Sequence, residues 1–434
     1  MALGGGTFVT QNKVLPGAYI NFVSLAAASA TLSDRGIATM PLVLDWGVEG
    51  AVVEVTNADF QKNSMKIFGY SYDHEKMKGL RDLFKNITTL YAYRLNGGGA
   101  KATNTYATAK FGGVRGNSLK VIIQKNVDDE TMFDVKTVMD TTVVDVQTVA
   151  KATDLVANDF VTWNAADLAV TAGVALEGGT NGTVDGAAHQ AYLDKIESYS
   201  FNALGVISAE DNIKTLYENF CKRLRDEVGA KFKAVIYQKP ADFEGVINVK
   251  NKITDEDWDE SCLVYWVTGI EAGCAVNKSN LNKVYDGEFT VDVDYTQTQL
   301  TKAIQAGEFV LHKVGSDIRV LEDINSLVTT SDTKGEVFKD NQTIRVIDQI
   351  ANDIAVLFNT KYLGVVPNDA AGRISLWTDI VKHHEQMQDI RAIESFSDED
   401  VTVSQGNTKK AVVVNDAVTV VNAMAKLYMT VTVT

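Results

Sequence analysis

The stretch of the chain that decides its fold is residues 203–237, with the sequence ALGVISAEDNIKTLYENFCKRLRDEVGAKFKAVIY. It opens with a short apolar run, Ala203 to Ile207, which predicts a strand, and Ser208 is a typical first residue of a helix. Gly229 marks the end of that helix, and a second strand is predicted over residues 234–237. A strand–helix–strand crossover places both strands parallel in one sheet, so this stretch predicts an α/β core.

The helix of this unit carries an apolar stripe at helical spacing, which we expect to face the sheet. The stripe comprises Ile213, Leu216, Tyr217, Phe220, Leu224 and Val228. Further along the chain, the apolar run at residues 263–267 predicts a third strand. Towards the N-terminus, residues 74–87 predict an amphipathic helix, and a strand is predicted over residues 90–95.

The rest of the chain differs from this unit in composition and in its predicted elements. Residues 103–184 are rich in Thr, Val, Asp and Gly, and they predict short strands such as 119–123 and 142–146. The last third predicts two helices, over residues 341–359 and 371–390. Their expected buried residues are Ile344, Ile347, Ala351, Ile354 and Phe358 in the first helix, and Ile374, Trp377, Val381 and His384 in the second. Strands are then predicted at 401–403, 411–414 and 418–421.

These patterns predict a multidomain protein of mixed α/β and α+β class, since 434 residues correspond to about three domains at roughly 150 residues each. The predicted division is an N-terminal arm (1–24), a discontinuous α/β domain (25–102 and 185–330), a β-rich inserted domain (103–184), a C-terminal α+β domain (331–425) and a C-terminal arm (426–434).

Both arms have the character of strands. From residue 427 onward, apolar and polar residues alternate, which is the period of a half-buried strand. Because no later hairpin partner follows in this sequence, we expect the strand to pair with an earlier strand or with another molecule. A second strand-like run follows Pro16 and Gly17. We therefore expect strand addition between subunits through Tyr19, Ile20, Phe22, Val23, Leu427, Tyr428, Met429, Thr430, Val431, Thr432 and Val433.

Composition narrows the function classes. The formal net charge of -15 argues against broad nucleic-acid binding, which needs clustered Lys and Arg. The sequence has no run of about 20 apolar residues and no signal peptide, so no membrane insertion is expected. Three cysteines without a CxxC pair indicate a reducing environment for folding.

Three motifs suggest chemistry and each lacks a required part. Residues 97–102 match GxGxxA, but the following Thr and Asn residues are poor helix formers, whereas a dinucleotide site needs a helix there. His384 and Glu385 resemble the HExxH zinc motif, but the second histidine is replaced by Gln388. The aspartates at 255, 257 and 259 alternate as in a calcium loop that lacks its glycine. We expect neither a metal nor a cofactor.

Two other functions remain open at this point. One is an α/β enzyme with an unrecognised site, which a pocket ringed by perturbed titratable groups would favour. The other is an adhesin-like binding module that uses the β-rich insertion. The five histidines are scattered along the chain, which leaves little material for general-base chemistry, so a structural subunit is the preferred interpretation.

Several short segments, taken in order, resemble the tail sheath proteins of contractile bacteriophage tails, in the shorter form of phages and prophages of Gram-positive bacteria. The segments are 12–20 (NKVLPGAYI), 34–38 (DRGIA), 45–47 (DWG), 113–119 (GVRGNSL), 176–180 (LEGGT) and 424–431 (MAKLYMTV). The resemblance covers nearly the whole chain, and no single segment is diagnostic. Ala425 departs from the acidic residue expected in relatives.

The resemblance implies a structural function. Sheath subunits form a helical homopolymer of hexameric rings stacked around a tail tube protein, and baseplate and tail terminator proteins are the further partners. Contraction drives the tube through the host envelope. N- and C-terminal arms join the sheets of neighbouring subunits. The implied location is the phage tail of the virion, after assembly in the bacterial host cytoplasm.

Overall fold

The computed structural model describes residues 32–164 and 166–433, and two compact units are distinguished in the chain. The larger unit contains residues 34–348 and 421–433 of this described part, and the smaller contains residues 349–420 together with residues 32–33. Each unit is considered by itself below.

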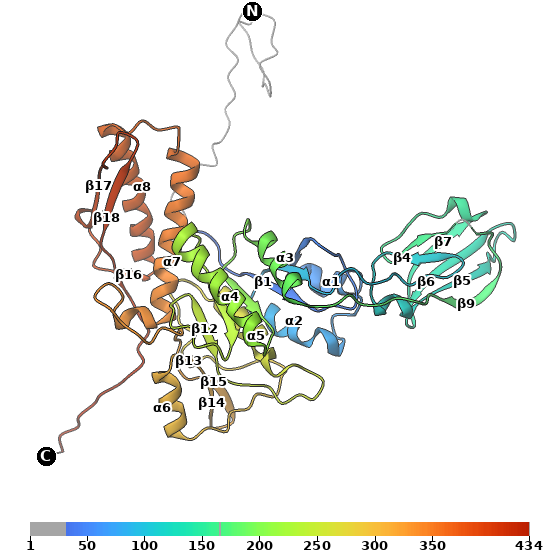
Figure 1. The fold of residues 1–434 in the computed structure, drawn as a ribbon, viewed down its shortest axis with the longest axis horizontal. Coiled ribbons are helices and arrows are strands. Elements are labelled where there is room, and N and C mark those ends of the chain that lie inside the picture. The colour runs from blue at the N-terminus through green and yellow to red at the C-terminus, as the bar shows by residue number, and fades with distance from the viewer. Residues whose placement is uncertain (1–31, 165, 434) are drawn as a thin grey trace, which may run out of the picture. The chain divides into compact units, whose positions relative to one another are not determined.

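The larger unit is built on a seven-stranded sheet with the order β13-β12-β11-β10-β1-β3-β2. Figure 1 labels β1, β12 and β13 of this sheet. Its strands are β1 (Ile37–Leu42), β2 (Val52–Thr56), β3 (Thr89–Arg94), β10 (Ala203–Val206), β11 (Lys233–Tyr237), β12 (Val246–Val249) and β13 (Glu308–Phe309). All neighbours are parallel except β2, which runs antiparallel to β3. The predicted α/β class is confirmed, and so is the parallel pairing of β10 with β11, in which Ala203 lies opposite Lys233.

Helices cover both faces of this sheet, as a parallel sheet requires. Val235 and Tyr237 of β11 belong to the same apolar core as α1 (Asn57–Phe68), α2 (Lys78–Phe84) and α5 (Leu263–Gly273). The alternate residues of β11 belong to a second core, with α3 (Gly186–Ile196) and α4 (Asp211–Arg223).

The predicted crossover helix is correct at its end, Gly229, and along its buried face except Val228, and it is wrong at its start. Ser208 does not begin the helix, because its hydroxyl accepts the N–H of Glu210 in the preceding loop and α4 starts at Asp211. Beyond α4 the chain widens into a π-helical turn, Leu224–Val228, and Gly229 ends it in the left-handed conformation with φ 89°. Because of this turn, Val228 is exposed instead of buried.

The third strand predicted over residues 263–267 is wrong, since this run is the first half of helix α5. The helix is buried almost all round, so it has no polar face whose spacing would reveal a helical period. The true third strand of the crossover series is β12, which the sequence analysis missed.

The chain leaves the sheet after β3 and forms a β-rich region before α3. A four-stranded antiparallel sheet has the order β7-β6-β5-β9, and β4 pairs with β8. The strands are β4 (Ala107–Ala109), β5 (Leu119–Lys125), β6 (Phe133–Met139), β7 (Thr142–Val149), β8 (Val161–Trp163) and β9 (Thr171–Ala175). The larger unit also holds α6 (Gln297–Gln305) and a hairpin of β14 (Leu311–Val314) and β15 (Asp317–Val320).

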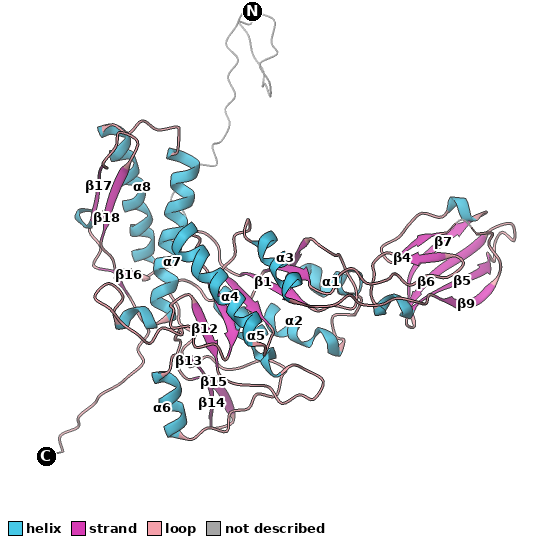
Figure 2. Cartoon of the chain, in the orientation of Figure 1, coloured by secondary structure: helices cyan, strands magenta, loops and turns pink. Residues whose placement is uncertain are grey.

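The smaller unit packs two-stranded sheets against long helices (Figure 2). Helix α7 (Asn341–Leu357) begins in the larger unit and ends in the smaller one, and α8 (Ala370–Asp389) follows. The strands of this unit are β16 (Ile393–Glu394), β17 (Val401–Gln405), β18 (Val412–Asp416) and β19 (Thr419–Val420). Antiparallel pairs join β17 with β18 and β16 with β19, so the strands predicted in this region are confirmed.

The predicted buried faces of α7 and α8 need correction. In α7 only Ile344 of the predicted face is fully buried, because the first turns bury polar side chains instead, among them Arg345 and Asp348. In α8, Val381 and His384 are buried as predicted, but Ile374 is 63% exposed. The buried stripe of α8 runs through Leu376, Ile380, His383 and Met387.

Candidate assembly interface

The C-terminal segment, residues 424–433, presents apolar side chains to solvent. It holds no helix or strand and is drawn in Figure 1 as an extended coil leading to the C label. Leu427, Tyr428 and Val433 are 86%, 90% and 90% exposed. Within the described residues, no hydrogen bond reaches this segment. Its alternating pattern therefore has no partner strand in the described part of its own subunit.

Seven consecutive residues of this segment belong to the set predicted for strand addition: Leu427, Tyr428, Met429, Thr430, Val431, Thr432 and Val433. The remaining residues of that set, Tyr19, Ile20, Phe22 and Val23, lie outside the described residues.

Residues 421–423, which form the root of this segment, are held on the first turn of α7. The side-chain amide of Gln342 donates to the Val421 carbonyl and accepts the N–H of Ala423, both at 3.0 Å. Asn422 lies between these two residues, and its amide nitrogen is 3.0 Å from the hydroxyl of Thr343. The exposed segment thus starts at a fixed point.

The sheet of β17 and β18 has two open edges, since each strand pairs with the other alone in the described chain. The bonds Gly406 N–H to Ala411 carbonyl and Ala417 N–H to Asp400 carbonyl fix the ladder, at 2.8 and 3.2 Å. Antiparallel residues alternate between facing the partner and facing away. The outward N–H and C=O groups are therefore those of Val401, Val403 and Gln405 on β17, and Val412, Val414 and Asp416 on β18.

Apolar hollows lie beside both strands. Ile374 and Trp377 of α8 line one hollow of about 270 Å³ together with Val403 of β17. Leu376 of α8 and Val412 of β18 line another of about 100 Å³. A strand added at either edge would place alternate side chains over α8, so the arrangement suits a segment with one apolar face.

Buried polar contacts fix the helix behind this sheet. The Trp377 indole N–H donates to the Val401 carbonyl at 2.9 Å. His384 Nε2 lies 2.9 Å from Asp416 of β18, and His383 Nε2 lies 3.0 Å from Asp353 of α7. Burial raises the pKa of Asp353, but hydrogen bonds from His383, Ser33 and Gln349 outweigh it and hold that pKa below its usual value.

These contacts explain the HExxH-like run. His384 is fully buried and engaged by Asp416, and the Gln388 side chain accepts the N–H of Phe396 at 2.7 Å. The two residues act within the core of the unit. In the part of the chain that the structure describes, no group of three or more His, Cys, Asp and Glu side chains could hold a metal ion.

The calcium-like and nucleotide-like motifs also have structural partners. Asp255 accepts from Lys78 Nζ at 2.6 Å and from the N–H of Thr290 at 2.8 Å. The glycine run continues as a loop in which an added Cβ at Gly99 would lie 1.8 Å from the Thr180 carbonyl oxygen. Glycine is therefore required where the two connections to the β-rich region pass each other.

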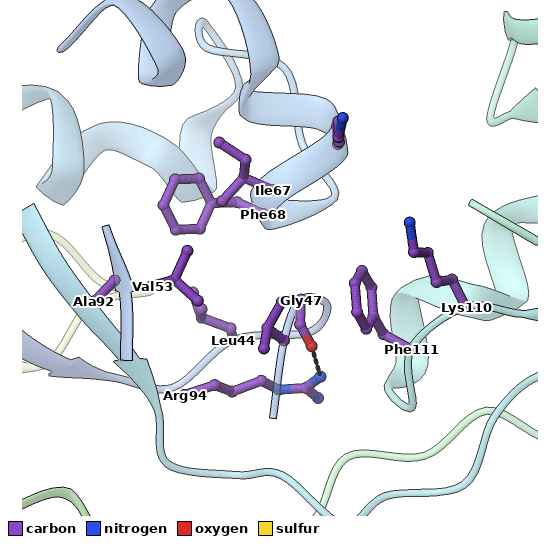
Figure 3. A pocket seen from close by; sticks show the side chains of 11 residues that line it. Leu44, Gly47, Val53, Ile67, Phe68, Ala92, Arg94, Lys110 and Phe111 are labelled. Carbon is purple, nitrogen blue, oxygen red and sulfur yellow. Dashed lines mark hydrogen bonds between the residues drawn. The ribbon is translucent and has the colours of Figure 1, made fainter. Parts of the chain in front are cut away.

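An apolar pocket of about 340 Å³ lies in the larger unit, lined by Leu44, Val53, Phe68 and Phe111 among others (Figure 3). Its buried polar group, Arg94, donates through Nη1 to the carbonyls of Gly47 and Gly112, at 3.2 and 2.7 Å. The described residues that line the pocket include two lysines, Lys66 and Lys110, and no carboxylate, histidine or cysteine.

Two of the segments quoted from the sequence meet at the junction with the β-rich region. The Asp45 carbonyl accepts the N–H of Arg115 at 3.3 Å, and the Asp45 carboxylate accepts from Tyr70, Lys76 and Asn181. Burial raises the pKa of Asp45, but these hydrogen bonds lower it below its usual value. The short segments therefore serve the packing of this junction.

Sequence reasoning missed the contacts of Gln342 and Thr343 with residues 421–423, and the open edges of β17 and β18. The sequence carried no signal for these edges, because three strands were predicted at 401–403, 411–414 and 418–421 and a local pattern does not tell which of them pair. The part of the chain that the structure describes contains no helix long and apolar enough to cross a membrane.

Comparisons with known proteins match almost the whole chain to one family. The matching profiles are the Gp18 domain III N-terminal region of the tail sheath protein (35–95), the phage tail sheath beta-sandwich domain (97–181), the phage tail sheath central domain (182–326) and the phage tail sheath C-terminal domain (333–434).

Relatives extend over the full length. The phage-like element PBSX protein XkdK of Bacillus subtilis is 32% identical, with 99% of this chain and 100% of that protein covered. The solved sheath tail protein of Desulfitobacterium hafniense is 38% identical with a TM-score of 0.79, covering 90% of this chain and 93% of that one. The corresponding Listeria innocua protein is 31% identical with a TM-score of 0.78, covering 92% and 95%.

A more distant likeness concerns the fold alone. A chain of the helical sheath of the anti-feeding prophage, solved in its contracted state, has a TM-score of 0.57 at 12% identity, covering 97% of this chain and 99% of that chain. Full-length identity above 30% to a phage-element protein, together with the four domain profiles, decides the assignment. The chain belongs to the phage tail sheath protein family.

Proposed function

We propose that the chain polymerises through strand addition into stacked six-fold rings around a tail tube, and that contraction of this sheath drives the tube through the host envelope. Residues 427–433 act as the donor strand and the β17–β18 sheet of a neighbouring subunit as the acceptor. Residues 1–24 act as a second arm, with Tyr19, Ile20, Phe22 and Val23 as its strand.

One observation carries this proposal. The segment alternates apolar and polar side chains and is exposed along its length, while the β17–β18 sheet has free edges beside apolar hollows. Exposed apolar side chains in such a run favour association, because their burial removes them from water. Several ladder hydrogen bonds, each worth roughly 0.5–1.5 kcal/mol net, would add to this.

The assembly gains from repetition. Two arms for each subunit raise the effective concentration of every further contact around a ring. Contraction requires two packing arrangements of similar free energy, and arms that stay paired would keep subunits connected while other contacts exchange. The anti-feeding prophage sheath, a protein of like fold, is recorded as a helical sheath in a contracted state.

The role is structural and non-enzymatic, with the β-rich region (103–184) as an inserted domain between the halves of the α/β domain (25–102 and 185–330). The domain at 331–425 carries the acceptor sheet. Further partners are the tail tube, baseplate and tail terminator proteins. Assembly takes place in the host cytoplasm before incorporation into the virion.

Deletion of residues 427–434 tests the proposal. We expect a folded monomer with an unchanged circular dichroism spectrum that forms no tubes in negative-stain images at concentrations where the intact chain does. Replacing Leu427, Met429, Val431 and Val433 together by Ser provides a full-length control for chain length. Tubes of normal length from the truncated chain would refute strand addition by this arm.

A further inference from the structure

The contact that holds the root of the C-terminal segment has an unusual form. A side-chain amide, that of Gln342, bonds two backbone groups: the Val421 carbonyl and the N–H of Ala423, each at 3.0 Å. Gln342 and Thr343 are buried, whereas Asn422 and Ala423 are exposed. The fixed partner is therefore the helix, and the chain that rests on it is a surface segment.

The geometry imitates a sheet. In an extended chain the carbonyl of one residue and the N–H two residues later point to the same side, where one residue of a parallel neighbour would bond both. The primary amide of Gln342 supplies one donor and one acceptor, and so takes the place of that neighbouring residue. The hydrogen bond between Asn422 and Thr343 then selects which residues of the chain occupy this position.

We propose that Gln342 is the positioning residue of the C-terminal arm, and that with Thr343 it fixes where the arm leaves the subunit and in which register. This inference rests on the proposed strand addition. Beyond Ala423 the ten residues to Val433 reach about 33 Å when extended. The proposed acceptor is the open sheet of a second copy of this chain.

Positioning matters because the arm binds at a distance set by its free length. With the root held, the arm searches a restricted volume around its exit point. Release of residues 421–423 would lengthen the free chain and lower the effective concentration of the donor strand at the acceptor. The ordering of the released residues would then oppose each strand-addition event.

The first measurement is amide hydrogen exchange of the full-length monomer. Gln342→Met keeps the length of the side chain and removes both hydrogen bonds, so we expect exchange at Ala423 to accelerate about tenfold. Asn422→Ala changes an exposed residue and should leave the fold intact. We expect it to accelerate amide exchange at Ala423 by a smaller factor. Gln61→Ala, an exposed glutamine on α1, is the matched control and should leave exchange at residues 421–426 unchanged.

The second measurement is the lowest protein concentration at which tubes form. We expect Gln342→Met to raise it about tenfold, with Asn422→Ala between Gln342→Met and the intact chain. Unchanged exchange at Ala423, or an unchanged threshold in spite of faster exchange, would overturn the inference. Failure of the proposed strand addition can be told apart from failure of this inference. In the first case the chain lacking residues 427–434 would assemble normally, while Gln342→Met would still accelerate exchange at Ala423.

Discussion

At the residue scale, Asp82 of α2 is a carboxyl group held in an apolar core. Its side chain is fully buried and accepts two contacts from the N–H of Glu288, at 2.8 and 3.0 Å, and one from the Tyr285 hydroxyl at 3.2 Å. Burial raises the pKa of Asp82 to about 6, and the backbone hydrogen bond from Glu288 offsets only part of that rise.

This pKa predicts a stability change with a definite sign. A carboxyl whose folded pKa is raised stabilises the fold fully below its unfolded pKa near 4, and the contribution is lost as the pH rises through about 6. We therefore expect the free energy of unfolding of Asp82→Asn, relative to the unmodified chain, to increase by about 2 kcal/mol between pH 4 and pH 7. Urea titrations at both pH values measure the difference.

The control for this experiment is Asp226→Asn, which changes an exposed aspartate in the turn after α4. This variant measures what an Asp-to-Asn substitution at an exposed position does over the same pH interval. A constant difference for Asp82→Asn would mean that Asp82 titrates alike in the folded and unfolded chains, and would contradict the assigned cause.

At the element scale, sequence periodicity was informative where an element has one solvent-exposed face and one buried face. The strand β17 alternates apolar and polar residues, and the apolar residues of α4 recur every three to four positions, so both were predicted. The strand β18 was predicted from its run of β-branched valines at 412–414. Helix α5 was mistaken for a strand because its surroundings are apolar on every side. In α7, the buried contacts of Arg345 and Asp348 come from distant parts of the sequence, so no local pattern reveals them.

The open edge of β17 supplies a prediction at this scale. The N–H of Val403 faces away from β18, whereas that of Thr402 faces β18 and belongs to the existing ladder. Proline removes a backbone donor. We expect Val403→Pro to leave the monomer folded and to reduce tube formation severely, if the incoming strand binds the edge of β17.

Thr402→Pro is the matched comparison, because it removes a donor from the ladder inside the subunit. We expect it to lower the thermal unfolding midpoint of the monomer by more than Val403→Pro does. Circular dichroism and negative-stain images of both variants separate the two effects. Normal tubes from Val403→Pro would assign the added strand to the edge of β18.

At the scale of the whole molecule, the proposed interface is predictable only in part from the sequence. The proposed donor is visible, since an alternating run such as Leu427 to Val433 is a local pattern. The acceptor is not, since it depends on which strands remain unpaired and where hollows such as that beside Trp377 lie. Those properties arise from tertiary packing, which places Ile374 of α8 in solvent next to β17.

Separate donor and acceptor sites predict how defective subunits act on intact ones. A chain that lacks residues 427–434 keeps the β17–β18 sheet, so it can accept an arm and cannot donate its own C-terminal strand. Mixed with intact protein, it should enter the growing polymer and leave a neighbour without a strand.

We expect the mean tube length to fall as the truncated fraction rises from none to one half, measured in negative-stain images at constant total protein. If the added strand binds the edge of β17, the truncated chain that also carries Val403→Pro has lost the C-terminal donor strand and its acceptor edge, so it should shorten the tubes less than the truncated chain alone. Equal shortening by both chains would show that the truncated subunits act through some contact other than the shared sheet.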